Sequence, residues 1–234
     1  MIYYHEPDGQ LALLELGCPA RVYIPLEEVS RLESLPGEGP EWCAVLPRVW
    51  RDRDEPALRT LLERARALGF TGVLIGNLGH LPLVRGLNFH LYGDYGLNVF
   101  NSRSLAYLKD KELESACVSF ELRFAQIRDL KKVLPAEAIV YGRLPLMITE
   151  NCLVQDETGC RLDRQGPCVP EDGPCRCGQP NVLVDRTGAA FPLLPAYGHR
   201  TEIQNSKPLY LADRPELFFC ACKMWQSACL FWRQ

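Results

Sequence analysis

Short apolar runs alternate with amphipathic segments five times between Trp42 and Arg143, and this alternation limits the fold more than any other feature of the sequence. Strands and helices that alternate with short connections are typical of βα units around a parallel sheet. The pattern therefore predicts an α/β protein, as either a doubly wound sheet or a (β/α) barrel. Five units fall short of the eight in a complete barrel. The expected strands cover residues 44–49, 72–76, 89–92, 115–119 and 138–142.

Polar residues stand where the expected strands end, and this regularity favours a partial (β/α) barrel with a site on one face. Ligands bind at the carboxyl ends of the strands in parallel α/β folds. Strand ends are also polar because they meet solvent, so each single residue has a second explanation. The residues expected at this face are the catalytic candidates Asn77, Asp94, Asn98, Glu121 and Tyr141, together with Arg48 and Arg143.

Charge and hydropathy exclude some classes of protein. The chain has 26 basic and 29 acidic side chains and a formal net charge of −3. This balance argues against nucleic-acid binding through bulk charge, although a local basic groove remains compatible with it. No apolar run is long enough to span a bilayer, and the first residues do not resemble a secretory signal. We therefore expect a cytoplasmic protein with no membrane partner.

Five of the eleven cysteines fall between Cys152 and Cys177, in a stretch rich in Gly, Pro, Asp and Arg. In a reducing compartment, clustered cysteines are more often metal ligands or catalytic thiols than disulfides. The tight Cys-x2-4-Cys pairs of zinc knuckles and the ferredoxin spacing are both absent. The spacing thus indicates a metal centre and leaves iron–sulfur and zinc open. Two short strands around a turn at residues 186–188 follow, which predicts a small cysteine-containing β appendage.

Several motifs follow one another along the chain: VLIGNLG (73–79), GDYGLNVFNS (93–102), YGRLPLMITENC (141–152), LVDRTGAAFPL (183–193) and HRTEIQNSKPLYLAD (199–213). Together they resemble the C-terminal portion of the longer members of the collagenase-like peptidase family U32. The resemblance implies a (β/α) barrel and a [4Fe–4S] cluster held by four cysteines. It also implies hydroxylation of a pyrimidine in tRNA or ribosomal RNA with prephenate, while the family name implies a peptidase, that is, a hydrolase.

The resemblance also implies a set of cluster ligands. The first and second cysteines of the family match Cys152 and Cys160, and the third matches Cys177, with Cys175 as its alternate. His199 occupies the fourth position, where the family has a cysteine. Histidine can ligate iron, as in Rieske centres. Otherwise Cys168 or Cys175 completes the site, zinc replaces the cluster, or no metal binds.

Four regions and three functions follow from these expectations. The regions are an extended or β segment (1–41), the barrel units (42–150), the cysteine-rich loop with its β appendage (151–213) and an atypical tail (214–234). The functions are an iron–sulfur enzyme of RNA modification, a collagenase-like peptidase and a non-catalytic accessory module. For the first, RNA and prephenate are the expected partners, and Arg48, Arg143 and Arg200 are the residues expected to grip carboxylates. A partner segment or subunit could complete the barrel.

Overall fold

The computed structural model describes residues 2–3, 21–35, 39–154, 181–196, 200–207, 209–210 and 229–233. The chain divides into two compact units. The first comprises residues 1–142 and 210–234, and the second comprises residues 143–209.

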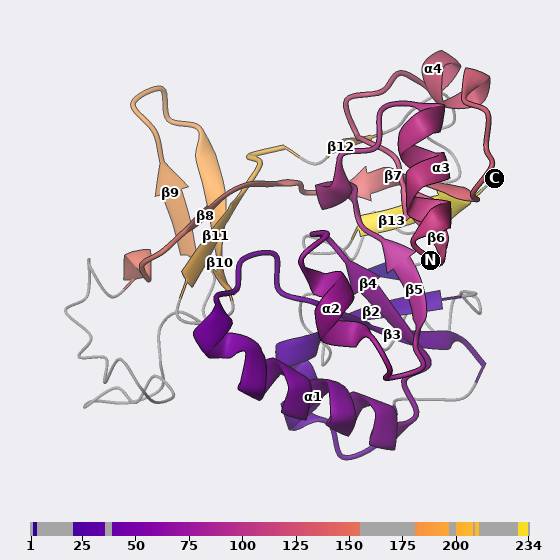
Figure 1. Cartoon of the computed structure of the whole chain (residues 1–234). Helices are drawn as coiled ribbons and strands as arrows, with labels where there is room; N and C mark the ends of the chain where they lie inside the picture. Colours follow the sequence, from indigo (N-terminus) through magenta and orange to yellow (C-terminus); the bar gives the residue numbers. More distant parts are fainter. Residues whose placement is uncertain are drawn as a thin grey trace. The chain divides into compact units, whose positions relative to one another are not determined.

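The first unit is built on six parallel strands that follow one another in the sheet in chain order (Figure 1). All five strands expected from the sequence are present and parallel to their neighbours, so the predicted α/β partial barrel is confirmed. A sixth strand, β2, precedes them and pairs in parallel with β3. The strands are β2 (Arg21–Pro25), β3 (Glu41–Val45), β4 (Gly72–Ile75), β5 (His90–Gly93), β6 (Leu113–Cys117) and β7 (Ala136–Gly142).

Two further strands connect the ends of this parallel series. The short β1 (Ile2–Tyr3) runs parallel to β2. Strand β13 (Cys229–Arg233) is antiparallel both to β1 and to β7. The backbone pairings therefore pass from β1 through β7 to β13 and back to β1. The parallel part remains a partial barrel, and an antiparallel strand lies between its first and last members.

Helices cross between the parallel strands, as the alternation predicts. The longest, α1 (Glu55–Leu68), has Pro56 in its first turn, where a missing N–H costs little. It buries Leu58, Leu62 and Ala65 on one face, and Gly69 ends it at φ +101°. The other helices are α2 (His80–Val84), α3 (Ser102–Asp110) and α4 (Phe124–Asp129), with the 3-10 turns η2 (Leu26–Arg31), η3 (Asp52–Asp54) and η4 (Tyr95–Leu97).

Close packing inside the sheet explains the glycine that begins β4. A Cβ atom on Gly72 would lie 2.3 Å from Cys43 Sγ and 2.8 Å from the Tyr92 ring. Both neighbours are buried, so neither could move away without disturbing the core. Gly72 therefore leaves room for larger side chains from β3 and β5.

The second unit contains a four-stranded antiparallel sheet in the order β8-β11-β10-β9. Between β9 and β10, the Asp185 carboxylate accepts hydrogen bonds from the backbone N–H groups of Thr187 and Ala189, and Gly188 adopts φ +82°. This confirms the turn expected at residues 186–188 and the β appendage. The strands are β8 (Pro145–Thr149), β9 (Asn181–Val184), β10 (Ala190–Ala196) and β11 (Arg200–Gln204), and β12 (Leu209–Tyr210) follows where the chain returns to the first unit.

Candidate functional site

The carboxyl ends of the parallel strands form a rim that carries most of the predicted site residues. Arg48 follows β3, Asn77 follows β4, Asp94 and Asn98 follow β5, and Glu121 follows β6. Asp94 is buried, with 7% of its surface exposed, whereas Asn77, Asn98 and Glu121 are exposed and Arg48 is half-buried. The structure thus brings these residues to one edge of the sheet.

Asp94 fixes the backbone that leaves β5. Its Oδ1 accepts a hydrogen bond of 2.7 Å from the Tyr95 N–H at the start of η4, and its own N–H donates to the Ile75 carbonyl on β4. Two residues after Asp94, a Cβ atom on Gly96 would lie 2.7 Å from the Gly76 carbonyl oxygen. The loops after β4 and β5 are therefore pressed together and leave little freedom at this point of the rim.

The asparagines of the rim have local structural roles. Asn77 Oδ1 accepts a hydrogen bond of 2.8 Å from the Gly79 N–H, which closes a turn before α2. Asn98 ends η4 in the left-handed conformation, at φ 50°. Asn101 caps α3 by accepting from the N–H groups of Arg103 and Ser104. These contacts account for the asparagines without a ligand, and the catalytic role of Asn77 and Asn98 stays a prediction.

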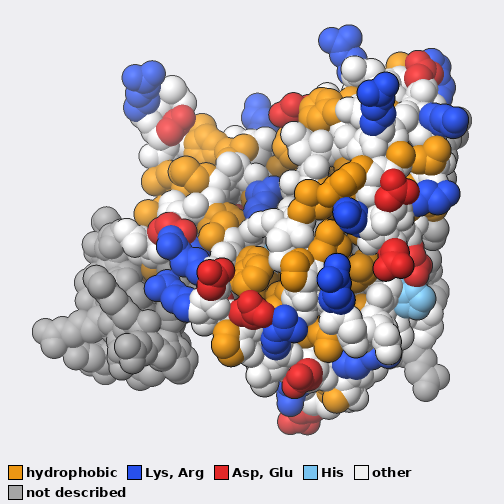
Figure 2. Space-filling view, viewed as in Figure 1, with side chains coloured by type: hydrophobic (Ala, Val, Ile, Leu, Met, Phe, Trp, Pro, Cys, Tyr) orange, Lys and Arg blue, Asp and Glu red, His pale blue; other side chains and the backbone are white. Residues whose placement is uncertain are grey.

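A row of three side chains crosses the rim, and two of its members were not among the predicted site residues. The Arg48 guanidinium carbon lies 4.7 Å from the centre of the Tyr95 ring. The Tyr95 ring meets Phe120 edge to face, with 6.1 Å between their centres. Phe120 is 37% exposed. Three other exposed apolar side chains follow the carboxyl ends of β4, β5 and β6: Leu78 and Phe100 in loops, and Phe124 at the start of α4. On the face that Figure 2 shows, basic, acidic and apolar side chains are intermingled.

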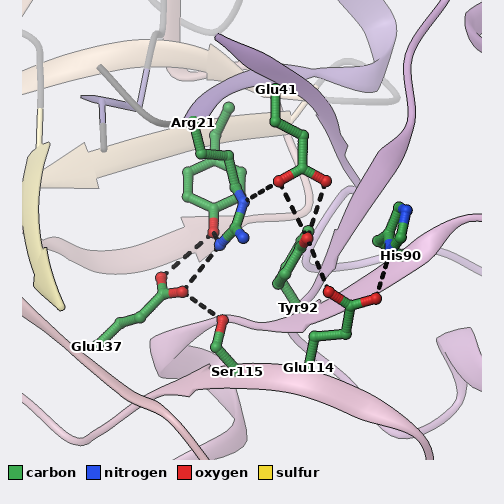
Figure 3. Close-up of polar contacts among 8 residues, drawn as sticks. Arg21, Glu41, His90, Tyr92, Glu114, Ser115 and Glu137 are labelled. Carbon is green, nitrogen blue, oxygen red and sulfur yellow. Dashed lines mark hydrogen bonds and ion pairs between the residues drawn. The ribbon is translucent and has the colours of Figure 1, made fainter. Parts of the chain in front are cut away.

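A second polar cluster occupies the opposite, amino end of the strands (Figure 3). The Arg21 guanidinium pairs with Glu41 at 2.8 Å and with Glu137 at 3.0 Å. Glu137 also accepts from the hydroxyls of Tyr23 and Ser115, and Tyr92 donates to Glu41. Because β2 and β7 are not neighbours in the sheet, the contact between Arg21 and Glu137 crosses the interior of the barrel.

The electrostatics of this interior cluster indicate a structural role. Burial opposes the charge of Arg21, but Tyr23, Glu41 and Glu137 together raise its pKa. Burial raises the pKa of Tyr23, and burial with Glu41 raises that of Tyr92. The guanidinium is therefore charged and both phenols are neutral near pH 7. Nothing in the local sequence marked these residues; their only signal is that charged residues begin or almost begin the apolar strands β2, β3 and β7.

The two histidines of the described residues form no ion pair or side-chain hydrogen bond with the rim carboxylates. His80, at the start of α2, is fully buried beside Trp50, and neither ring nitrogen makes a hydrogen bond within the described residues. Burial lowers its pKa to about 4, and an interaction with the Pro47 backbone only partly offsets this decrease. His90 is exposed at the amino end of β5 and pairs with Glu114. Neither histidine is arranged as the base of a nucleophilic site.

The second unit positions one of the predicted metal ligands. Cys152 is half-buried just after β8. The chain around it is held to β11, because Thr201 Oγ1 accepts from the Leu153 N–H at 3.0 Å and donates to the Asn151 carbonyl at 3.3 Å. Cys160, Cys168, Cys175, Cys177 and His199, and the side chain of Tyr141, lie outside the described residues. Among the residues that are described, no group of three or more metal-binding side chains occurs.

The other two predicted carboxylate-binding arginines belong to the second unit as well. Arg143 Nη1 donates to the carbonyls of Asn205 and Ser206, at 2.8 and 2.5 Å. Arg200 is 3% exposed and lies 3.5 Å from Glu150. Arg143 directly follows β7, and its guanidinium ties the chain before β8 to the turn after β11. A substrate role for either arginine stays a prediction.

Comparison with known proteins supplies the family. A model of peptidase family U32 matches residues 34–179, which is more than half of the chain. The chain belongs to peptidase family U32. The match spans the barrel strands β3 to β7, strand β8 and the cysteine-rich stretch, so it covers both the rim and Cys152.

Two other comparisons gave no match to this U32 protein. No curated protein and no solved structure is significantly similar to it. Within the described residues, no helix combines the length and the apolar character that a membrane crossing requires.

Proposed function

We propose that this U32 protein is an iron–sulfur enzyme, or the cluster-bearing part of one, that hydroxylates a pyrimidine in tRNA or ribosomal RNA. The proposal follows the expectation raised by the family resemblance. The observation that carries it is the pairing of β8 with β11 around Cys152. In reducing cytoplasm, where we place the protein, thiolates remain free to bind metal.

That pairing supports the proposed ligand set through described residues that are close in sequence to two of the ligands. Thr149 is opposite Thr201 in the sheet, and Glu150 forms an ion pair with Arg200. Cys152 follows Glu150 by two residues, and His199 directly precedes Arg200. A thiolate and an imidazole from these two segments, with Cys160 and Cys177, would make a three-cysteine, one-histidine set. Cys175 and Cys168 are the alternates, and zinc is the alternative metal.

The rim of the barrel would bind the substrates. Arg48 offers a guanidinium to a small carboxylate such as prephenate, since planar N–H donors suit carboxylate oxygens. Asp94 and Glu121 are the acidic residues at the same edge, and the exposed Phe120 offers a ring face to a base. When bound, the cluster would supply electron-transfer chemistry, while these side chains bind and orient the reactants.

Peptidase activity has only the family name in its favour. The described histidines are buried without a hydrogen-bond partner or paired with Glu114 at the amino end of the strands. A nucleophile therefore has no histidine base beside it among the described residues. A partner segment could join the barrel between β7 and β1 only by displacing β13, because β13 already pairs with both strands.

Iron and sulfide analysis of anaerobically purified protein tests the proposal. We expect iron and acid-labile sulfide in the parent, loss of both in Cys152→Ser, and no loss in Cys117→Ala, which removes a buried strand thiol. His199→Cys should retain more iron than the parent. Zinc without sulfide would reject the cluster. RNA from cells lacking the protein, analysed for hydroxylated pyrimidines, would then test the activity, and cleavage of gelatin by metal-free protein would favour the peptidase.

A further inference from the structure

Arg48 is a cation at the rim whose position is set by an aromatic ring and not by an acid. Within the described residues it makes no hydrogen bond or ion pair, and its guanidinium carbon lies 4.7 Å from the centre of the Tyr95 ring. A carboxylate partner would occupy the N–H donors and cancel the charge. A ring face attracts the cation but leaves its in-plane donors available.

Tyr95 is itself held in place by contacts of its backbone and of its ring. Its backbone begins η4, where Asp94 accepts from its N–H and the Asn98 N–H donates to its carbonyl at 2.9 Å. Gly96 abuts the Gly76 backbone, so η4 cannot shift toward β4. The ring itself meets Phe120 at an interplanar angle of 63°.

The loop that carries Phe120 is tied to the same segment. Val99 forms a parallel bridge with Val118, and the Ser119 N–H donates to the Val99 carbonyl at 2.9 Å. The ends of β5 and β6 therefore move together. Tyr95 is a fixed support, whereas Arg48 comes from the loop after β3 and has a long, flexible side chain.

We propose that Tyr95 is a positioning residue that holds Arg48 ready to bind an oxyanion, a carboxylate or a phosphate, at the rim. An unsupported arginine loses side-chain freedom when it binds, and a ring beneath the guanidinium removes part of that loss in advance. Phe120 supports Tyr95 through its contact with the ring. The inference deepens the proposed function, because both use the rim, but binding of a simple anion requires neither RNA nor metal.

The test is a double-mutant cycle read by calorimetric or NMR titration. Malonate represents the carboxylate source and inorganic phosphate the phosphate source, and the preferred anion identifies the source. Arg48→Gln should weaken binding of that anion about tenfold or more, and Tyr95→Leu about three- to tenfold. Tyr95→Phe keeps the ring and should bind like the parent. Arg48→Gln with Tyr95→Leu should bind no more weakly than Arg48→Gln alone.

Arg66 provides a matched control. Its guanidinium carbon lies 5.4 Å from the centre of the Phe89 ring, so it is also an arginine over an aromatic ring. However, Arg66 is in the last turn of α1 and Phe89 directly precedes β5, at the amino end of the strands. Arg66→Gln should leave the affinity unchanged, and an equal loss there would overturn the proposal by showing a general charge effect.

Other outcomes would also overturn it. If Arg48→Gln binds both anions like the parent, the rim has no oxyanion site at Arg48. Strictly additive losses in the double variant would mean that Tyr95 acts without Arg48. Should Tyr95→Leu fail to fold, Phe120→Leu carries the same test, with an expected loss of about two- to fourfold. If the variants bind the anion as expected but the protein hydroxylates no RNA, the proposed function is rejected and the anion site at Arg48 stands.

Discussion

Glu137 shows how a single buried charge can tie a barrel together. Only 1% of its surface is exposed, yet it accepts hydrogen bonds from Arg21, Tyr23 and Ser115. Removing one member of a buried ion pair is costly because the other charge stays buried without compensation. Arg21 retains Glu41, so the loss would be partial.

We therefore predict that Glu137→Gln lowers the free energy of unfolding by about 3 kcal/mol, at the lower end of the range for broken buried pairs. Glu114→Gln is the matched control, since the Glu114 side chain is 47% exposed in its pair with His90. That change should cost less than about 1 kcal/mol, as exposed pairs do. Urea denaturation measures both. Equal losses in the two variants would show that the buried pair contributes no more to the free energy of unfolding than the exposed one.

His80 predicts a pH dependence of stability. Burial lowers its pKa to about 4 in the folded protein, from the ordinary histidine value of 6.5. Between these values the unfolded chain takes up a proton that the folded protein does not, so the free energy of unfolding falls as the pH drops through this window. One histidine would account for about 2 kcal/mol between pH 7 and pH 5.

His80→Leu should remove that part of the pH dependence, whereas the exposed His90→Gln should not. Denaturation of the parent and both variants at several pH values between 4 and 7 would measure it. A parent and a His80→Leu variant with the same pH profile would contradict the prediction and show that protonated His80 is accommodated.

At the level of elements, the five strands of the βα pattern could be predicted from the sequence, whereas strands β2 and β13 could not be predicted individually. Each expected strand is apolar and short, and the structure differs mainly in its bounds, as in β3, which covers residues 41–45 where 44–49 was expected. Strand β2 was expected only as part of an extended segment, because it is five residues long and has no helix before it to complete a βα unit. Tail 214–234 has no βα pattern, yet it contains β13.

The interior cluster and the rim row were unpredictable for the same reason. Arg21 and Glu137 are 116 residues apart, and Arg48 meets Tyr95 from another βα unit. Whether such residues face each other depends on the register of strands that do not adjoin, and local patterns carry no information about it. The polar rim could be predicted because strand direction alone places it.

We predict that Phe231→Pro detaches β13 from β7. A proline cannot donate to the ladder, and Phe231 is opposite Ile139 in the register. Amide hydrogen exchange of residues 137–141 should rise by at least tenfold, because their partner strand is lost. Leu183→Pro is the matched control, since β9 pairs only with β10 within the described residues and belongs to the second unit. Unchanged exchange in Phe231→Pro would contradict the pairing.

At the scale of the whole molecule, the division into two units separates the proposed metal centre from the barrel. Small sheets with a metal site usually depend on the metal for their stability. We predict that anaerobic chelation of iron increases amide exchange in β8 and β11 but not in β3 and β4. Cys152→Ser without chelator should reproduce this pattern. An equal increase in both units, or none, would contradict it.

The pairing of β1 with β13 affects how the protein folds during its synthesis. Ile2 is opposite Leu230, so the strand pairings of the barrel become complete only after the ribosome has synthesised the whole chain between these two residues. Until then the outer edges of β1 and β7 offer unpaired backbone groups to any extended chain nearby. Slow translation would lengthen the time for which these strand edges are exposed, and a chaperone that covers them would reduce wrong pairing with other chains.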